Sequence, residues 1–408
     1  MGHVRTVIYF VLTSLDLRLS NEFKYYGGLF MKSTILKVCA LMLMTGSLAQ
    51  AAGKLNMDAR IDAQGQSYND AAKTAVMGHD NYRYYLKTAR LDYQNSLNEK
   101  TSFRGRLVLN TTQGAVNSRD NLNNTVDLFF VNYKLADGMD LTAGKFTSDM
   151  GGLENQYSGA DVYLFSEANG GVSSKLDTNT KAVYAADSGK TAAAFTWANT
   201  GITKYYTGVK LAYKFSEQEL ALHNADLPAD DTTSGNASQT RTMTGLVYKG
   251  SFMEKMLMPI FSYHTSLLPG ASSGSVDAKA NFIAAGLKVN VASQVIDIDY
   301  LINSFPSRTT SAGSDETDTV QSTTVAWSMP MDSLTPKVKI ESSKLSAAAT
   351  KIYDVTAAGV ALEWKPVKEE NFRFHTAYNM KQFKPVSGDT IAYNEFMVGM
   401  RINADFLK

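Results

Sequence analysis

The chain has 408 residues and a formal net charge of +1, and 44% of its residues are hydrophobic. The length suffices for two or three ordinary soluble domains or for one large barrel, and the near-neutral charge excludes a strongly basic nucleic-acid-binding protein. Beyond residue 51 no apolar run approaches the roughly 18 residues that a membrane-spanning helix needs, so a helical membrane protein is excluded too. A membrane β-barrel is not excluded, because its lipid-facing residues alternate with polar ones.

Residues 31–51 have the features of a secretory signal peptide. These features are the positive residues Lys32 and Lys37, the apolar stretch 38–44 and the small-x-small site Ala49-Gln50-Ala51 before Ala52. We therefore expect cleavage between Ala51 and Ala52. Residues 1–30 either precede the true start, Met31, or form a disordered extension, and residues 52–408 are expected to form one barrel domain.

From residue 54 onward the chain alternates between apolar and polar residues. In residues 54–64 one row is Leu55, Met57, Ala59, Ile61 and Ala63, and the other is Asn56, Asp58, Arg60, Asp62 and Gln64. A strand places successive side chains on opposite faces, so one face is apolar and the other carries full charges. This pattern recurs to the end of the chain without a helical period, and it predicts a closed sheet with an apolar exterior and a water-filled interior.

The alternation predicts eighteen strands, with sixteen as the alternative. They are expected at 54–66, 82–95, 101–112, 124–136, 139–146, 178–187, 190–199, 206–215, 218–225, 241–252, 256–265, 279–291, 294–304, 319–330, 334–344, 351–365, 370–382 and 392–406. Every second connection is short, and those between are mostly longer and rich in Gly, Ser, Thr, Asn and Asp. This sorting is typical of a transmembrane antiparallel β-barrel with short periplasmic turns and long extracellular loops.

Aromatic residues of the outward parity gather near the short turns. They are Tyr93, Phe103, Tyr133, Phe215, Phe252, Trp327, Trp364 and Phe372. Amphipathic rings concentrate at the boundary between membrane and water, so these residues indicate an aromatic girdle at the short-turn rim.

With these features the chain resembles a Gram-negative outer-membrane porin of the general-diffusion type. The resemblance rests on the signal 31–51, on Asp140-Leu-Thr-Ala-Gly-Lys-Phe146 with the loop that follows, and on the closing strand. It implies a homotrimer in the lipid and lipopolysaccharide of the outer membrane, which passively admits ions and small hydrophilic solutes. It also implies that barrel-assembly machinery reads the alternating residues of the last strand, Phe396, Val398, Met400, Ile402 and Phe406.

The resemblance further implies that the third long connection, 147–177, folds into the barrel and narrows it. This connection carries the carboxylates Asp149, Glu154, Asp161 and Glu167, and the inward parity of the early strands supplies Arg60, Arg90, Arg104 and Arg106. An acidic loop opposite a basic wall would create a transverse field that favours polar solutes. Alternatively, these charges are solvated lumen residues that are not aligned with one another.

No motif indicates an enzyme, a metal site or a cofactor. Gly270-Ala-Ser-Ser-Gly274 matches a nucleophile elbow only by its letters, because it lies in a Ser/Gly loop, and the histidines lack metal-ligand spacing. The acidic groups in 226–231 and 315–318 are either solvated or hold divalent cations that bridge lipopolysaccharide. We therefore expect a passive channel, with a substrate-selective channel for sugars, phosphate or carboxylates as the alternative, and a non-conducting structural or adhesive barrel as a further one.

Overall fold

The computed structural model describes residues 53–70, 80–109, 126–172, 205–226, 242–268, 278–306, 317–347, 350–367, 371–386 and 389–406. These residues form sixteen strands. The strands are β1 (Lys54–Tyr68), β2 (Asn81–Ser96), β3 (Thr101–Val108), β4 (Val126–Ala136), β5 (Met139–Thr147), β6 (Tyr205–Phe215), β7 (Gln218–Asp226), β8 (Thr242–Lys249), β9 (Leu257–Leu268), β10 (Ala278–Val291), β11 (Gln294–Pro306), β12 (Thr317–Ser328), β13 (Leu334–Ala347), β14 (Thr350–Trp364), β15 (Phe372–Pro385) and β16 (Ile391–Asp405).

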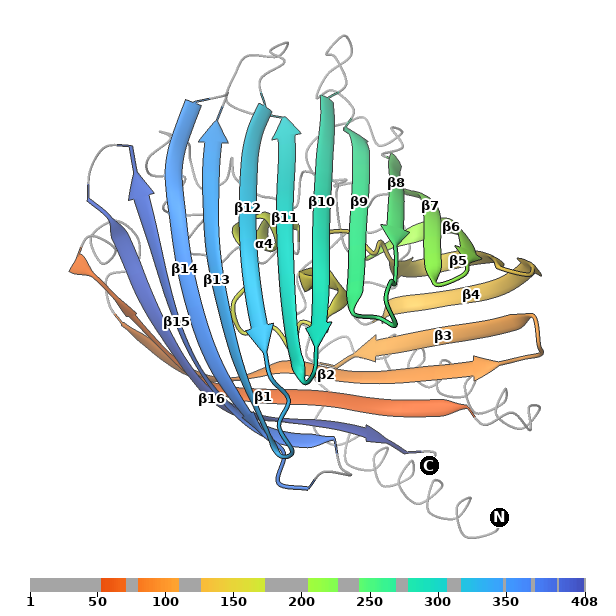
Figure 1. The fold of residues 1–408 in the computed structure, drawn as a ribbon, viewed down its shortest axis with the longest axis horizontal. Helices are drawn as coiled ribbons and strands as arrows, with labels where there is room; N and C mark the ends of the chain where they lie inside the picture. Colours follow the sequence, from red (N-terminus) through yellow and green to blue (C-terminus); the bar gives the residue numbers. More distant parts are fainter. Residues whose placement is uncertain are drawn as a thin grey trace, which may run out of the picture. The chain divides into compact units, whose positions relative to one another are not determined.

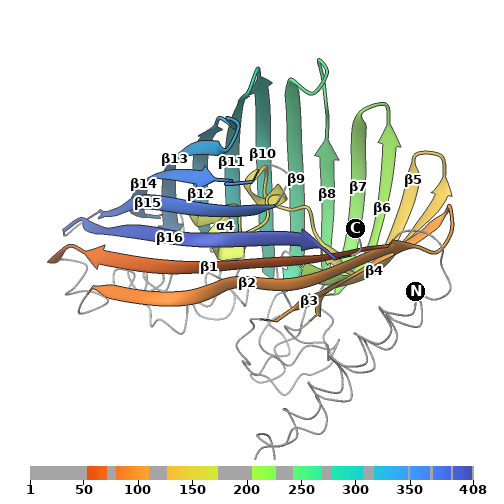
Figure 2. The same ribbon diagram turned by 90° about the horizontal axis from the view of Figure 1, so that it is seen from below.

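The strands close into one antiparallel barrel, in which each strand pairs with its sequence neighbours and β1 pairs with β16 (Figures 1 and 2). At the closing seam Arg60 lies opposite Arg401, and Asp62 lies opposite Gly399. Complete closure leaves no sheet edge with unpaired backbone groups, as an all-β structure in lipid requires.

The prediction of eighteen strands was wrong, and the alternative of sixteen is confirmed. The two extra strands, 178–187 and 190–199, lie outside the described residues, and the barrel closes without them because β5 pairs directly with β6. Both segments contain several alanines, and alanine is a weak strand former. Counting strands by alternation alone therefore predicted two strands too many.

Tight turns join the strands at one rim. Two-residue turns at 137–138, 216–217 and 292–293 connect β4 to β5, β6 to β7 and β10 to β11. Gly138, Ser216 and Ala292 have φ values of 74°, 52° and 53°. One residue of each turn thus adopts the left-handed conformation, which lets the chain reverse direction within two residues.

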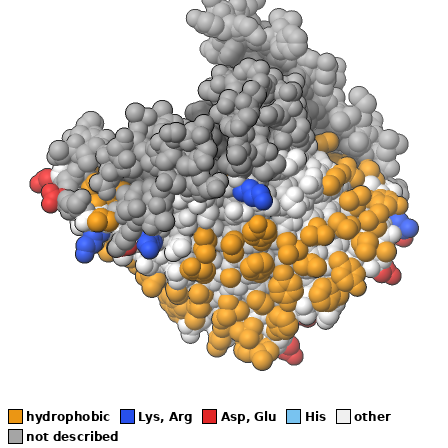
Figure 3. All heavy atoms as spheres, turned by 90° about the horizontal axis from the view of Figure 1, so that it is seen from above, with side chains coloured by type: hydrophobic (Ala, Val, Ile, Leu, Met, Phe, Trp, Pro, Cys, Tyr) orange, Lys and Arg blue, Asp and Glu red, His pale blue; other side chains and the backbone are white. Residues whose placement is uncertain are grey.

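The outward row of the barrel is apolar, as predicted. Ile298, Ile340 and Val360 expose 41%, 52% and 52% of their surfaces, and hydrophobic side chains cover much of the face seen in Figure 3. Of the predicted girdle, Trp364 and Phe252 are exposed, whereas Tyr93 is buried. Exposure of so much apolar surface indicates a lipid-facing exterior.

The inward row is mixed, which differs from the water-filled interior expected from the pattern. Charged residues such as Arg60, Asp62 and Asp299 point inward and are almost completely buried. Toward the ends of the strands that lie away from the tight turns, the inward residues are apolar and form a cluster. Met150 and Ala168, from the connection after β5, pack into this cluster with Phe282 and Leu301. Part of the lumen is therefore filled by a packed core.

No helix in the described part of the chain is long and apolar enough to cross a membrane. The predicted leader 31–51, its cleavage site at Ala51 and Ala52, and residues 1–30 lie outside the described residues.

Candidate functional site

The connection after β5 folds into the barrel, which confirms the predicted inward third loop. Its described part, residues 148–172, contains a 3₁₀ turn, η2 (Glu154–Gln156), and one short helix, α4 (Glu167–Val172). Both lie inside the ring of strands in the two perpendicular views of Figures 1 and 2. We call residues 148–172 the constriction loop.

Inward side chains of the wall accept hydrogen bonds from backbone N–H groups of the constriction loop. The carboxylate of Asp299 on β11 accepts from Leu153 at 2.8 Å and from Glu154 at 2.9 Å. Gly152 makes this approach possible, because a Cβ atom there would lie 2.5 Å from the Asp299 carboxylate oxygen. Wall groups on β12 and β13 hold α4 in the same way: Ser322 accepts from Ala168 at 2.9 Å, and Glu341 accepts from Glu167 at 2.7 Å.

Other wall residues donate to carbonyl groups of the loop. Each donor comes from a different strand: Arg60 to Ala160 at 2.7 Å, Asn379 to Tyr163 at 2.9 Å, Lys339 to Leu164 at 2.9 Å and His264 to Ser148 at 3.1 Å. Because buried backbone groups need hydrogen-bond partners, these contacts substitute for the regular secondary structure that most of the loop lacks.

All four predicted loop carboxylates pair with cations of the wall. Glu154 pairs with Lys339 at 2.9 Å, Asp161 with Arg373 at 2.5 Å and also with Arg401, Glu167 with Lys381, and Asp149 with Lys210 and Lys249 at 3.3 Å each. Burial alone would raise the pKa of Glu154, but the ammonium group of Lys339 holds that pKa below its usual value. Against the same effect of burial, wall cations also lower the pKa values of Asp149 and Asp161. Asp149, Glu154 and Asp161 therefore remain ionised at neutral pH.

The arginines predicted to face these acids have other partners. Arg104 pairs with Asp92 at 2.9 Å, and Arg106 pairs with Asp127 at 2.7 Å. Arg60 contacts the loop, but through the Ala160 carbonyl and the Tyr163 ring, while its ion pair is with Asp62 at 2.9 Å. The cations that meet the loop acids come from β6, β8, β13, β15 and β16. The sequence showed that these cations face inward. It did not show which part of the wall the loop would lie against.

Two guanidinium groups of β2 lack a carboxylate partner within the described ranges. Arg83 donates to Gln64 at 2.5 Å and lies over the Tyr85 ring. Arg90 faces inward opposite Asp58, whose carboxylate is bound by Arg401 instead. Together with Arg104 and Arg106 on β3, they give this stretch of the wall a basic character. Sequence reasoning identified Arg90 but missed Arg83, because a bulge in the β1–β2 pairing after Arg60 shifts the parity of β2.

Two loop tyrosines that the sequence did not single out also contact the wall. The hydroxyl of Tyr157 donates to Asp297, and that of Tyr163 donates to Glu363 at 2.9 Å. These bonds fix the rings on the side of the loop that faces the tight turns.

A closed antiparallel barrel with an apolar exterior and a third loop folded into its lumen defines the porin class of outer-membrane proteins. Solved structures share the fold. An anion-selective porin from Comamonas acidovorans has a TM-score of 0.58 at 11% identity and covers 87% of this chain and 100% of its own. The outer membrane channel DcaP of Acinetobacter baumannii has a TM-score of 0.57 at 13% identity, and the match covers 87% of this chain and 97% of DcaP. OmpT of Vibrio cholerae in its trimer form has a TM-score of 0.56 at 12% identity, and the match covers 86% of this chain and 100% of OmpT.

The family model described as phosphate-selective porin O and P matches residues 54–265, and the chain belongs to this family. No curated protein sequence matches the chain. The protein is therefore a porin of the Gram-negative outer membrane that forms a channel for passive diffusion, and its family and fold are those of a channel rather than an enzyme.

Proposed function

We propose that this porin admits small hydrophilic solutes between the constriction loop and the inward face of β2 and β3, and that it favours small anions, inorganic phosphate among them. The observation that carries this proposal is the pair of guanidinium groups, Arg83 and Arg90, without carboxylate partners in the described part of the barrel. The family description, phosphate-selective porin, supports the same solute class. A planar guanidinium group suits phosphate because it can donate two parallel hydrogen bonds to it.

The proposal is tested with Arg90→Gln in planar bilayers under a salt gradient. Removing one charge a few ångströms from the solute path changes the electrostatic energy of an anion by about 1 kcal/mol in water and that of a cation by as much in the opposite direction, so the anion-to-cation permeability ratio changes by about thirtyfold. We expect the reversal potential to move toward cation preference by that ratio, and phosphate to reduce the chloride current less than in the wild type.

Lys100→Gln, at an exposed tight turn, removes the same charge outside the lumen and is the matched control. An unchanged reversal potential in Arg90→Gln, or an equal shift in both variants, would contradict the proposal.

A second candidate is a general-diffusion pore with little charge preference. It is favoured by the neutralisation of the loop carboxylates and of Arg104 and Arg106 by local ion pairs. Paired charges leave a weak net field along the pore. A wild-type reversal potential close to zero, with no saturable effect of phosphate, would select this candidate.

We also propose that the chain assembles as a homotrimer surrounded by outer-membrane lipid and lipopolysaccharide. The trimer form of OmpT from Vibrio cholerae supports this state by analogy of fold. The outward residues of the closing strand, among them Phe396 and Phe406 with 52% and 55% exposure, present the row proposed to be read by the assembly machinery. Native mass determination in detergent tests the trimer, and a monomeric mass would exclude it.

A further inference from the structure

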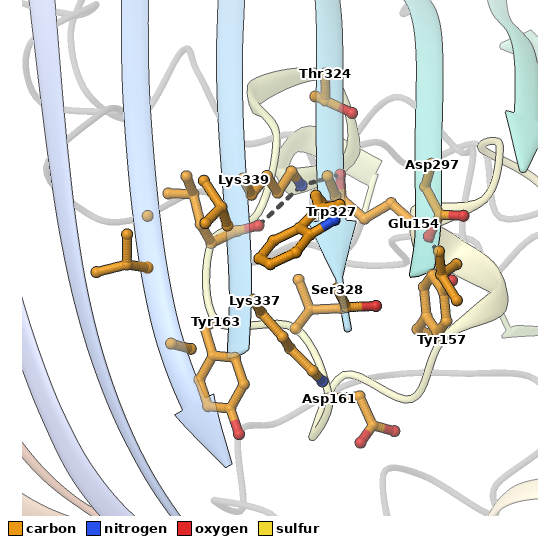
Figure 4. A pocket seen from close by; sticks show the side chains of 18 of the residues that line it. Glu154, Tyr157, Asp161, Tyr163, Asp297, Thr324, Trp327, Ser328, Lys337 and Lys339 are labelled. Atoms are coloured by element: carbon orange, nitrogen blue, oxygen red, sulfur yellow. Dashed lines mark hydrogen bonds and ion pairs between the residues drawn. The ribbon is translucent and has the colours of Figure 1, made fainter. Parts of the chain in front are cut away.

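A cavity of about 130 Å³ lies between the constriction loop and strands β11–β14. Figure 4 shows Tyr157 and Asp297 toward one side of it, and Lys337, Lys339 and Tyr163 toward the other. The wall between these groups carries a small side chain, Ala326 on β12, which leaves space opposite the loop. Since one buried water needs about 10–15 Å³ by a comparable measure, the cavity has room for a solute of several non-hydrogen atoms.

The strand register places opposite charges on either side of this small residue. Asp297 on β11 pairs with Ala326, and Ala326 pairs with Lys339 on β13. Neighbouring strands lie about 4.8 Å apart, so a carboxylate and an ammonium group rise from the wall about two strand spacings apart. A solute between them would meet an acidic group at one end and a basic group at the other.

Each end has hydrogen-bonding capacity that the protein does not use. The Oδ1 atom of Asp297 is buried and accepts no hydrogen bond from the described residues; its nearest cation, Lys288, is 4.0 Å away. Of three N–H donors on each lysine, Lys337 uses one, to Glu363, and Lys339 uses two, to Glu154 and the Leu164 carbonyl. One acceptor and three donors therefore remain.

The tyrosine rings at the two sides are held in place. Tyr157 is fixed through its hydrogen bond to Asp297, and the Lys288 ammonium group lies over its ring, 4.7 Å from the ring centre. Tyr163 is fixed through Glu363, and Arg60 lies over its ring at 4.6 Å. A site whose walls are already ordered costs a solute little conformational entropy on binding.

We propose that this cavity is a subsite for small zwitterions of amino-acid type, on the side of the constriction loop that faces the tight turns. The ammonium group of the solute binds Asp297, and its carboxylate binds Lys337 and Lys339. The subsite is independent of the anion preference proposed above, because it uses no residue of β2 or β3.

The experiment compares L-alanine with its two halves, propionate and ethylamine, on the full-length protein in planar bilayers and by titration calorimetry in detergent. We expect L-alanine to bind saturably to the wild-type protein in the calorimetric titration. Propionate lacks the group for Asp297 and ethylamine lacks the group for the lysines, so each loses a charge-assisted hydrogen bond and should bind at least about tenfold more weakly.

Two variants complete the test. Ala326→Leu fills the cavity without removing a charge, and it should abolish saturable alanine binding, whereas Val325→Leu on the opposite face of the same strand should not change it. Asp297→Asn preserves the shape of the cavity and should weaken alanine binding about tenfold while leaving propionate binding unchanged. This variant tests the proposal even if Ala326→Leu does not assemble. Equal binding of propionate, equal binding of ethylamine, or no saturable alanine binding to the wild type would each overturn the proposal.

Discussion

At the scale of single residues, the inward carboxylates of the wall differ by the partners they bind. Asp62 accepts from Arg60 and His375, as a charge lining a polar lumen would. Asp299 and Glu341 instead accept from backbone N–H groups of the constriction loop. The sequence places all of these carboxylates on the inward row. The loop N–H groups that Asp299 and Glu341 bind lie more than a hundred residues away along the chain, and this pairing follows from the path of the loop.

Asp299→Asn tests the anchoring role of this carboxylate. An amide has one acceptor oxygen instead of two, so the N–H of either Leu153 or Glu154 would lose its partner, at a cost of about 1–3 kcal/mol. We expect larger fluctuations of the open-channel current and a higher mean conductance, with the barrel still resistant to heat in detergent. Asp137→Asn in a tight turn serves as the control, and unchanged current noise in Asp299→Asn would refute the anchoring.

At the scale of elements, the constriction loop owes its position to the wall rather than to its own helices. The 3₁₀ turn has three residues and α4 has six, and helices of this length are not stable in isolation. Four carboxylates of the loop reach five strands of the barrel through ion pairs. The loop is thus an element whose conformation exists only inside the closed barrel.

The lowered pKa values of Asp149, Glu154 and Asp161 determine how the loop responds to acid. A carboxyl whose folded-state pKa is lowered contributes its full stabilisation above its ordinary pKa of about 4 and loses it as the pH falls through the folded-state value. We expect the ion pairs of these three carboxylates to persist down to about pH 5, and their loss to make the channel noisier below about pH 4.

Single-channel recording across this range is the measurement. Glu154→Gln, which is neutral at every pH, should remove its own share of the acid effect. A conductance change near pH 6 or 7 in the wild type would mean that other groups control the loop.

At the scale of the whole molecule, the lumen combines an apolar core with a network of paired charges. The apolar cluster joins residues of the loop to inward residues of most strands, and burial of this surface stabilises the loop inside the barrel. The ion pairs formed by Arg104 and Arg106 remain on the opposite part of the wall. The solute path proposed above therefore lies along one side of the lumen.

Arg104→Ala combined with Arg106→Ala should widen this path and make it more cation-selective. The double variant removes two long side chains and leaves Asp92 and Asp127 without their cations, so the local charge becomes negative. We expect higher conductance and a reversal potential shifted toward cations by more than in Arg90→Gln. Lys100→Ala with Lys255→Ala, both at exposed turns, is the control, and unchanged conductance and selectivity in the double variant would count against the path.

For most of the barrel the sequence by itself determined which residues face lipid and which face the lumen, because a strand has a period of two and a closed barrel in a membrane keeps one face apolar. The bulge that turns Arg83 of β2 inward was decided only by the strand pairing. It also indicated the inward third loop, through its length, its place in the order of connections and the family it resembles. Only the tertiary structure decided that sixteen strands suffice, since pairing of β5 with β6 is a long-range event that local alternation does not specify. It alone also decided which cations meet the loop carboxylates, because ion-pair partners depend on where the loop lies across the barrel and not on the parity of any one strand.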